Sequence, residues 1–188
     1  MRHSLGIYGA LLGLAVVLGS SSAVQAGPVL GGQVYTSGGN ISVEILGGSA
    51  GHFSKIYLDN SGVPGGSLVG NNQTMLGHVE AISGLTPHQE LIFRIDNTTS
   101  GQTFFIGPAS RNGDNFIHAT VDWDFVPGKA LIEFEDLLNG GDQDYNDIRF
   151  LVSGKLSPTP NPEPVSMAIW GLGASGAWFI ARRKRLAI

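Results

Sequence analysis

Apolar and polar residues alternate with a period of two through the middle of this chain, as they do in half-buried β-strands. The alternation is clearest over residues 41–45, 119–125, 132–135 and 148–153, and weaker strand patterns cover 54–58, 78–82, 90–96 and 102–106. Gly-rich turns such as DNSG, VPGG and RNGD separate these segments, and no long helical period interrupts them. Short strands at this spacing predict an all-β domain, an antiparallel β-sandwich or jelly roll, over residues 27–156.

The first 26 residues have a different pattern. Arg2 precedes an uncharged apolar run from Leu5 to about Gly19, and small residues follow, with Val24 and Ala26 at the −3 and −1 positions of a cleavage site. This order predicts a secretory signal peptide, which signal peptidase removes during export. A buried N-terminal helix is the alternative, but the segment has no polar face.

A second apolar run, residues 165–181, contains no charge and ends at four consecutive cations, Arg182, Arg183, Lys184 and Arg185. A helix of this length spans about 25 Å, which is near the lower limit for crossing a bilayer. Because clustered cations resist translocation, this end is expected to stay in the cytoplasm while the β-domain lies across the membrane. The run therefore predicts a single C-terminal membrane helix with a basic stop.

The triplet Pro162, Glu163 and Pro164 precedes this helix, and the whole tail, 162–188, resembles the PEP-CTERM sorting signal of Gram-negative bacteria. The resemblance implies recognition by an exosortase, cleavage near the triplet, and export across the inner membrane to the outer surface or an exopolysaccharide matrix. A permanent membrane anchor remains the alternative. Residues 157–161, Ser-Pro-Thr-Pro-Asn, are expected to form a stiff, extended linker to this tail.

The predicted β-domain is more acidic than the whole chain, because the basic residues at the two ends are not part of it. Residues 27–161 contain six cationic and fourteen acidic side chains, a formal charge of −8, whereas the whole chain carries −4. An acidic domain argues against nucleic acid as a partner, because phosphate binding requires Lys and Arg. It fits cation binding or solubility. The chain has no cysteine, which excludes disulfides and thiolate metal sites.

The stretch FEDLLNGGDQDYNDIRF, residues 134–150, concentrates acidic residues between two predicted strands. Its candidate cation ligands are Glu135, Asp136, Asp142, Asp144, Asn146 and Asp147. Calcium takes about six to eight oxygen ligands in flexible geometry, so the turn predicts a calcium site. It is not an EF-hand, since Asp147 stands where that loop requires Gly and no helices flank it. A solvated acidic hairpin without an ion remains the alternative.

The same stretch resembles the DUF4114 family, in which a Glu-Asp pair, a Gly-Gly-Asp turn and an Asp-Tyr-Asn-Asp block precede the final strand. The resemblance covers residues 89–154. It implies a structured acidic loop in an exported bacterial protein and brings no catalytic activity. Residues 31–82 lie outside it and are either the first half of the same sandwich or a variable extension.

One enzyme-like motif stands in the chain, GGSAG at residues 47–51, which fits the G-x-S-x-G nucleophile elbow. That elbow must open a helix, whereas the residues that follow alternate like a strand, so Ser49 is interpreted as a turn residue. Trp123 and Tyr145 are candidate sugar platforms, but we expect Trp123 to pack in the core and Tyr145 beneath the acidic turn. The sequence thus favours an exported, non-enzymatic surface or matrix protein stabilised by calcium. The alternative is a carbohydrate-binding module acting on exopolysaccharide.

Overall fold

The computed structural model describes residues 27–160. The predicted signal peptide with its cleavage site, the sorting triplet, the membrane helix and the basic stop all lie outside the described residues. Within residues 27–160, no helix is long and apolar enough to span a bilayer.

The described part of the chain is built from antiparallel strands, which confirms the all-β prediction. The strands are β1 (Val29–Leu30), β2 (Tyr35–Thr36), β3 (Gly39–Gly47), β4 (Ser54–Leu58), β5 (Ser67–Asn71), β6 (Val79–Leu85), β7 (Gln89–Glu90), β8 (Phe93–Asn97), β9 (Gln102–Phe105), β10 (Ala119–Asp122), β11 (Lys129–Phe134), β12 (Ile148–Ser153) and β13 (Leu156–Ser157). Two single 3₁₀ turns, η1 (Ala109–Arg111) and η2 (Leu138–Gly140), are the only helical elements among these residues.

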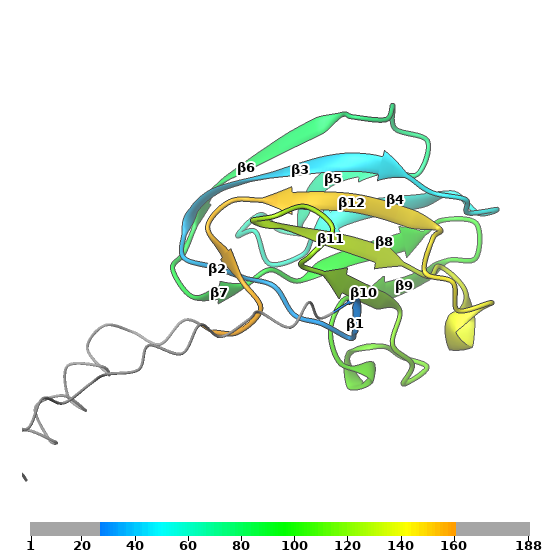
Figure 1. Cartoon of the computed structure of the whole chain (residues 1–188). Helices are drawn as coiled ribbons and strands as arrows, with labels where there is room; N and C mark the ends of the chain where they lie inside the picture. Colours follow the sequence, from blue (N-terminus) through cyan, green and yellow to red (C-terminus); the bar gives the residue numbers. More distant parts are fainter. Residues whose placement is uncertain (1–26, 161–188) are drawn as a thin grey trace, which may run out of the picture.

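Two larger sheets lie face to face and enclose one hydrophobic core, as in a β-sandwich (Figure 1). One has six strands in the order β1-β10-β11-β12-β3-β6, and the other has four in the order β5-β4-β8-β9. A small third sheet, β13-β2-β7, lies at the end where the described chain finishes. The sheets meet because each strand turns one row of apolar side chains inward.

The core follows the alternation seen in the sequence. In β3 the inward residues Val43 and Ile45 are fully buried, and the residues between them are half-buried. Three phenylalanines from opposite sheets meet at the centre: the ring of Phe150 lies 5.1 Å from that of Phe93 and 6.2 Å from that of Phe134. Each such side chain contributes about 1.5–3 kcal/mol by burial, so this layer is one substantial part of the core that holds the two sheets together.

Residues 31–82 contribute strands to both of the larger sheets. Strand β3 pairs with both β12 and β6 inside the six-stranded sheet, and β4 pairs with both β5 and β8 in the four-stranded sheet. This segment is therefore the first half of the same sandwich rather than an extension of it.

Several boundaries differ from the prediction. The strand expected over 119–125 ends at Asp122, whose carboxylate accepts a hydrogen bond from the Asp124 amide at 2.8 Å and turns the chain. Trp123 still packs against the core, whereas Phe125 is 50 % exposed. The strand expected over 90–96 divides into β7 and β8, which belong to different sheets. The linker expected from residue 157 begins later, because Ser157 pairs with β2.

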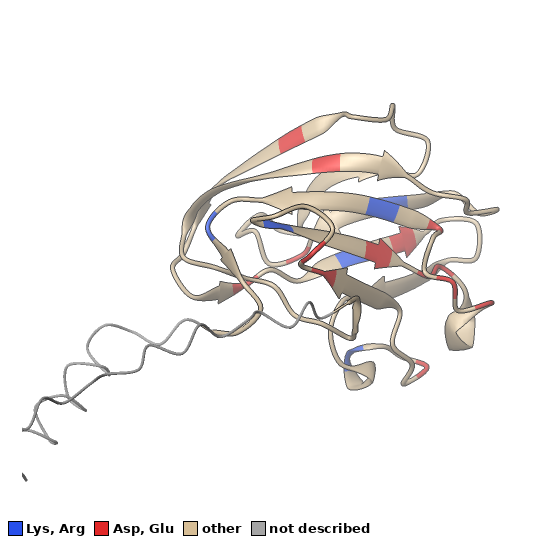
Figure 2. Cartoon of the chain, viewed as in Figure 1, with Lys and Arg blue, Asp and Glu red and all other residues tan. Residues whose placement is uncertain are grey.

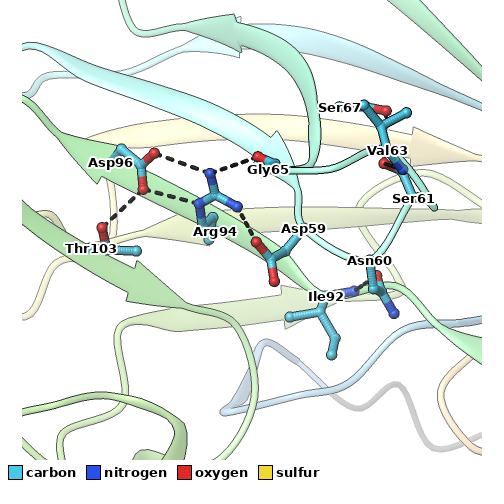
Figure 3. A network of polar contacts seen from close by, with 10 residues as sticks. All are labelled: Asp59, Asn60, Ser61, Val63, Gly65, Ser67, Ile92, Arg94, Asp96 and Thr103. Carbon is cyan, nitrogen blue, oxygen red and sulfur yellow. Dashed lines mark hydrogen bonds and ion pairs between the residues drawn. The ribbon is translucent and has the colours of Figure 1, made fainter.

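A guanidinium fixes the β4–β5 connection on the outer face of the four-stranded sheet (Figure 3). Arg94 donates to Asp96 Oδ1 at 3.0 Å and to the Gly65 carbonyl at 3.0 Å, and it also pairs with Asp59. Its Cζ lies 4.4 Å from the centroid of the Tyr57 ring, a cation–π distance. The exposed side of Tyr57 is therefore occupied by the protein's own Arg94.

Candidate metal centre

The acidic turn connects two paired strands, and this pairing brings its two ends together. Phe134, the last residue of β11, is the register partner of Ile148, the first residue of β12. Glu135 and Asp136 follow directly after β11, and Asp147 directly precedes β12, so their carboxylates meet at one end of the sandwich. Figure 2 shows the acidic residues of this connection gathered at that end.

The five carboxylates predicted as cation ligands form two overlapping groups. Glu135, Asp142 and Asp144 present oxygen atoms that all lie within 4.8 Å of one another, and so do Glu135, Asp136 and Asp147. Calcium–oxygen distances are about 2.3–2.6 Å, so oxygens that share one ion are separated by no more than about 5 Å. Both groups meet this limit, and these acidic clusters can hold a metal ion.

Asn146, the sixth predicted ligand, has a different environment. Its side-chain oxygen accepts a hydrogen bond from Ser49 Oγ, and its side-chain nitrogen donates to Asp144 Oδ2. Its carbonyl oxygen accepts from the Ser49 amide at 3.0 Å. Asn146 therefore joins the acidic turn to the β3–β4 connection.

Glu135 is the central and least solvated member of the cluster. The residue is 1 % exposed, and its Oε2 atom has no hydrogen-bond partner among the described residues. Burial, followed by a hydrogen bond between the Glu135 and Asp147 carboxyl groups and by the charges of Asp147 and Asp142, raises the pKa of Glu135 to about 8. A buried carboxylate without a donor is costly when ionised, so near neutral pH it retains a proton or requires a cation.

Asp136 connects the cluster to the opposite sheet. It is 2 % exposed, its Oδ2 atom accepts from Ser54 Oγ at 2.9 Å, and its carbonyl oxygen accepts from Asn97 Nδ2 at 2.8 Å. Its amide donates to Asp147 Oδ2 at 2.9 Å. Burial raises the pKa of Asp136 and the charge of Asp147 adds to this, while the hydrogen bond from Ser54 opposes it.

No basic side chain within residues 27–160 neutralises this cluster by an ion pair. The ion pairs of these residues involve other acids: Asp59, Glu80, Glu90, Asp96, Asp114, Glu44 and Glu133. The imidazole of His52 favours the ionised form of Asp136 but forms no ion pair with it. The five neighbouring carboxylates repel one another, which favours either partial protonation or a bound cation.

The turn contains left-handed backbone conformations, which most residues avoid. Asn139, Gln143 and Tyr145 all have φ near +60°, in the left-handed region. Gly141 also has positive φ, and a Cβ there would collide with Glu135 Oε1. Tyr145 is half-buried and donates from its hydroxyl to the Ile117 carbonyl at 3.1 Å, in line with its expected place beneath the turn.

A buried histidine also supports the turn, and sequence reasoning missed it. His118 is fully buried, with Nδ1 3.1 Å from the Glu135 carbonyl and Nε2 2.9 Å from Asp114 Oδ2. The same Asp114 oxygen accepts from the Asn139 amide at 2.9 Å. No local sequence pattern connects His118 to the turn, since the fold alone brings it beside the Glu135 carbonyl.

Close packing against the acidic turn accounts for the glycine at position 48 of the GGSAG motif. A Cβ at Gly48 would collide with the Asp147 carbonyl oxygen and lie 2.9 Å from Ile148 Cα, so the β3–β4 connection approaches the turn backbone to backbone. Strand β4 follows this connection, as the sequence predicted, and Ser49 bonds Asn146.

Gly48→Ala is expected to lower the free energy of unfolding by about 1–3 kcal/mol, because backbone atoms on both sides must separate. Gly51→Ala is the matched control: an added Cβ meets nothing within 4 Å there, so a change of less than about 0.5 kcal/mol is expected. Urea unfolding of both variants measures the difference. Equal midpoints would contradict the close approach.

A match to a known family covers the acidic turn. Residues 86–155 match DUF4114, described as a domain of unknown function. The matched segment runs from β7 through β12 and includes the whole acidic turn with the supporting Asp114 and His118. Ser54 and Gly48, which contact the turn from the first half of the sandwich, lie outside it. No curated protein and no solved structure matches the chain.

Proposed function

We propose that this protein is an exported, non-enzymatic component of the cell surface or extracellular matrix, and that calcium bound in the acidic turn stabilises its β-domain. The observation that carries the calcium assignment is the buried Glu135 carboxylate. One of its oxygens lacks a donor while four other carboxylates surround it. A divalent cation supplies the missing partner for this oxygen and neutralises the repulsion.

Calcium fits this set of ligands better than other common cations. The donors are carboxylate oxygens, which hard cations prefer, and neither thiolates nor clustered imidazoles take part. Magnesium demands near-octahedral geometry and gives up its waters reluctantly, whereas calcium accepts irregular sets of carboxylates. Calcium modules outside the cell bind with dissociation constants of about 10⁻⁴–10⁻³ M. Such a site can couple binding to folding in a chain that has no disulfides.

Export is supported by the sequence of the two ends. The signal-peptide pattern of residues 1–26 and the Pro162, Glu163, Pro164 triplet with its apolar run and basic stop are the features that support delivery by signal peptidase and an exosortase. In this proposal the tail holds the protein in the inner membrane only transiently, before release to the outer surface or an exopolysaccharide matrix.

Replacing Arg182, Arg183, Lys184 and Arg185 together with Gln is expected to reduce surface delivery at least severalfold, because the cations that hold the tail in the cytoplasm are gone. Surface biotinylation and cell fractionation measure the delivered fraction. Lys155→Gln, a charge removed from an exposed site of the β-domain, is the control and should leave delivery unchanged. Normal delivery of the tail variant would exclude this role of the basic cluster without touching the calcium assignment.

Carbohydrate binding is the second candidate, and one feature favours it. A solvent-open pocket of about 320 Å³ lies beside the acidic turn and is lined by Leu46, Gly48, Ser49, Asn146 and Arg149. The outward residues of the six-stranded sheet weigh against it, since they include Ser42, Glu44, Thr120, Glu133 and Ser153 rather than an aromatic row. Calcium-dependent retention on immobilised exopolysaccharide, lost in Ser49→Trp, would support this candidate.

A further inference from the structure

We propose that the turn binds two cations rather than one, in an inner and an outer site that share Glu135 as a bridging carboxylate. The inner site consists of Glu135, Asp136 and Asp147, and the outer site consists of Glu135, Asp142 and Asp144. This inference rests on the proposed calcium binding and assigns it a stoichiometry and a division of roles.

The first argument is geometric. Oxygens that share one calcium ion lie within about 5 Å of each other. The five carboxylates fall into two groups that satisfy this limit, and Glu135 is the member common to both. A carboxylate has two oxygens, so Glu135 can contribute one to each ion. Its Oε2 atom, buried and without a donor, is available for this purpose.

The second argument is the charge that must be neutralised. The five carboxylates carry a formal charge of −5 when ionised, and none of them pairs with Lys, Arg or His within the described chain. One divalent cation leaves −3 in a partly buried cluster, and two leave −1. Because unpaired buried charge is strongly unfavourable, the second ion relieves repulsion that the first leaves behind.

The two sites differ in what surrounds them. In the inner site, Asp136 accepts from Ser54 of β4 and Asp147 accepts from the Asp136 amide, each through Oδ2. Their Oδ1 atoms receive no hydrogen bond from any described donor and are left for a cation. Asn97 of β8 holds the Asp136 carbonyl. An inner ion therefore lies where the six-stranded and four-stranded sheets meet.

The outer site belongs to the turn alone. Asp142 and Asp144 are exposed, and their carboxylates accept from residues of the turn: Asp142 from the Asp144 amide at 3.5 Å, and Asp144 from the Asn146 amide at 3.1 Å and from the Asn146 side chain. An outer ion orders residues 137–146, and its link beyond the turn runs through Asn146 to Ser49 of the β3–β4 connection. The inner ion should thus control global unfolding, and the outer ion should control local opening of the turn.

Stoichiometry tests the inference directly. The full chain, purified in a non-ionic detergent, is titrated with calcium by calorimetry and by equilibrium dialysis, and two ions per chain are expected. Asp144→Asn should bind one ion, keep most of the calcium-dependent rise in Tm, and expose the turn to proteolysis in calcium. Asp147→Asn should weaken inner binding at least tenfold and lose most of that rise. Asp124→Asn, an exposed acid outside the cluster, is the control and should bind two.

A measurement on the unmutated chain covers the case in which a variant fails to fold. Terbium replaces calcium at oxygen sites, and Tyr145 within the turn can sensitise its emission. Two saturation steps are expected. One ion per chain in the unmutated protein overturns the two-site inference and leaves a single calcium site standing. No bound ion overturns the calcium assignment as well. Equal loss of the Tm rise in Asp144→Asn and Asp147→Asn overturns the division of roles.

Discussion

Saturating calcium is expected to raise the Tm of this protein by about 10 °C relative to the same protein in chelator. For a dissociation constant of about 10⁻⁴ M, 10 mM free calcium is about one hundred times that constant, and binding to the folded state alone adds about 2.7 kcal/mol. In a domain of this size, each kcal/mol corresponds to a Tm shift of about 3–5 °C. Differential scanning calorimetry in 10 mM calcium and in excess chelator provides the comparison.

Glu135→Gln tests this expectation, because the variant should keep or gain stability in chelator and should lose the stabilisation by calcium. Glutamine has nearly the same shape but cannot ionise, so the variant should be at least as stable as the unmutated protein in chelator at pH 8. It should also lose the response to calcium, since Glu135 belongs to both carboxylate groups. Asp124→Asn should retain the full calcium response. A Glu135→Gln protein that still gains 10 °C with calcium would show that the ion binds elsewhere.

In chelator, the stability of the protein is expected to fall as pH rises. The pKa of Glu135 lies at about 8 in the folded state, against an ordinary value of 4.5, and burial also raises the pKa of Asp136. The folded state therefore holds protons that the unfolded chain has released. The free energy of unfolding should decrease from about pH 4.5 to about pH 8, by a few kcal/mol, and level off above that.

Calcium should suppress this pH dependence, because the ion binds the ionised carboxylates and replaces the protons. Urea midpoints measured from pH 5 to pH 9, with and without calcium, show both effects, and the gap between the two curves should widen with pH. Glu135→Gln in chelator should have a flatter profile than the unmutated protein. A stability in chelator that increases between pH 5 and pH 8 would contradict the assignment of a raised pKa to this cluster.

Much of the fold could be predicted from alternation alone. Strands β3, β4, β11 and β12 overlap the segments in which the sequence placed them, because alternation of apolar residues leaves one face that must be buried. Strands β1, β2, β7 and β13 are only two residues each, too short to show a period. Strand β5 could not be seen either, since Gly70 breaks its apolar pattern at the point where Thr74 and Ile45 approach closely.

Only part of the candidate site could likewise be predicted from the sequence. The acidic turn was visible in the sequence because its carboxylates stand within thirteen consecutive residues, 135–147. Ser54, Asn97, Asp114 and Gly48 were not visible as part of the site. Each is distant in sequence, and none carries a local pattern that connects it to the turn. The register of β11 against β12 and the packing of the two sheets bring them there.

Local composition thus determined that this chain forms antiparallel strands, that its charge is concentrated in one turn, and which carboxylates that turn contains. Period-two hydrophobicity and clustered acids are local properties, so the sequence states them directly. Only the tertiary structure decided that Glu135 and Asp136 are buried and that one Glu135 oxygen has no donor. Likewise, only the folded chain separates the acids into two groups around Glu135. Burial and solvation depend on neighbours from distant parts of the chain, and these arrive only when the two sheets pack.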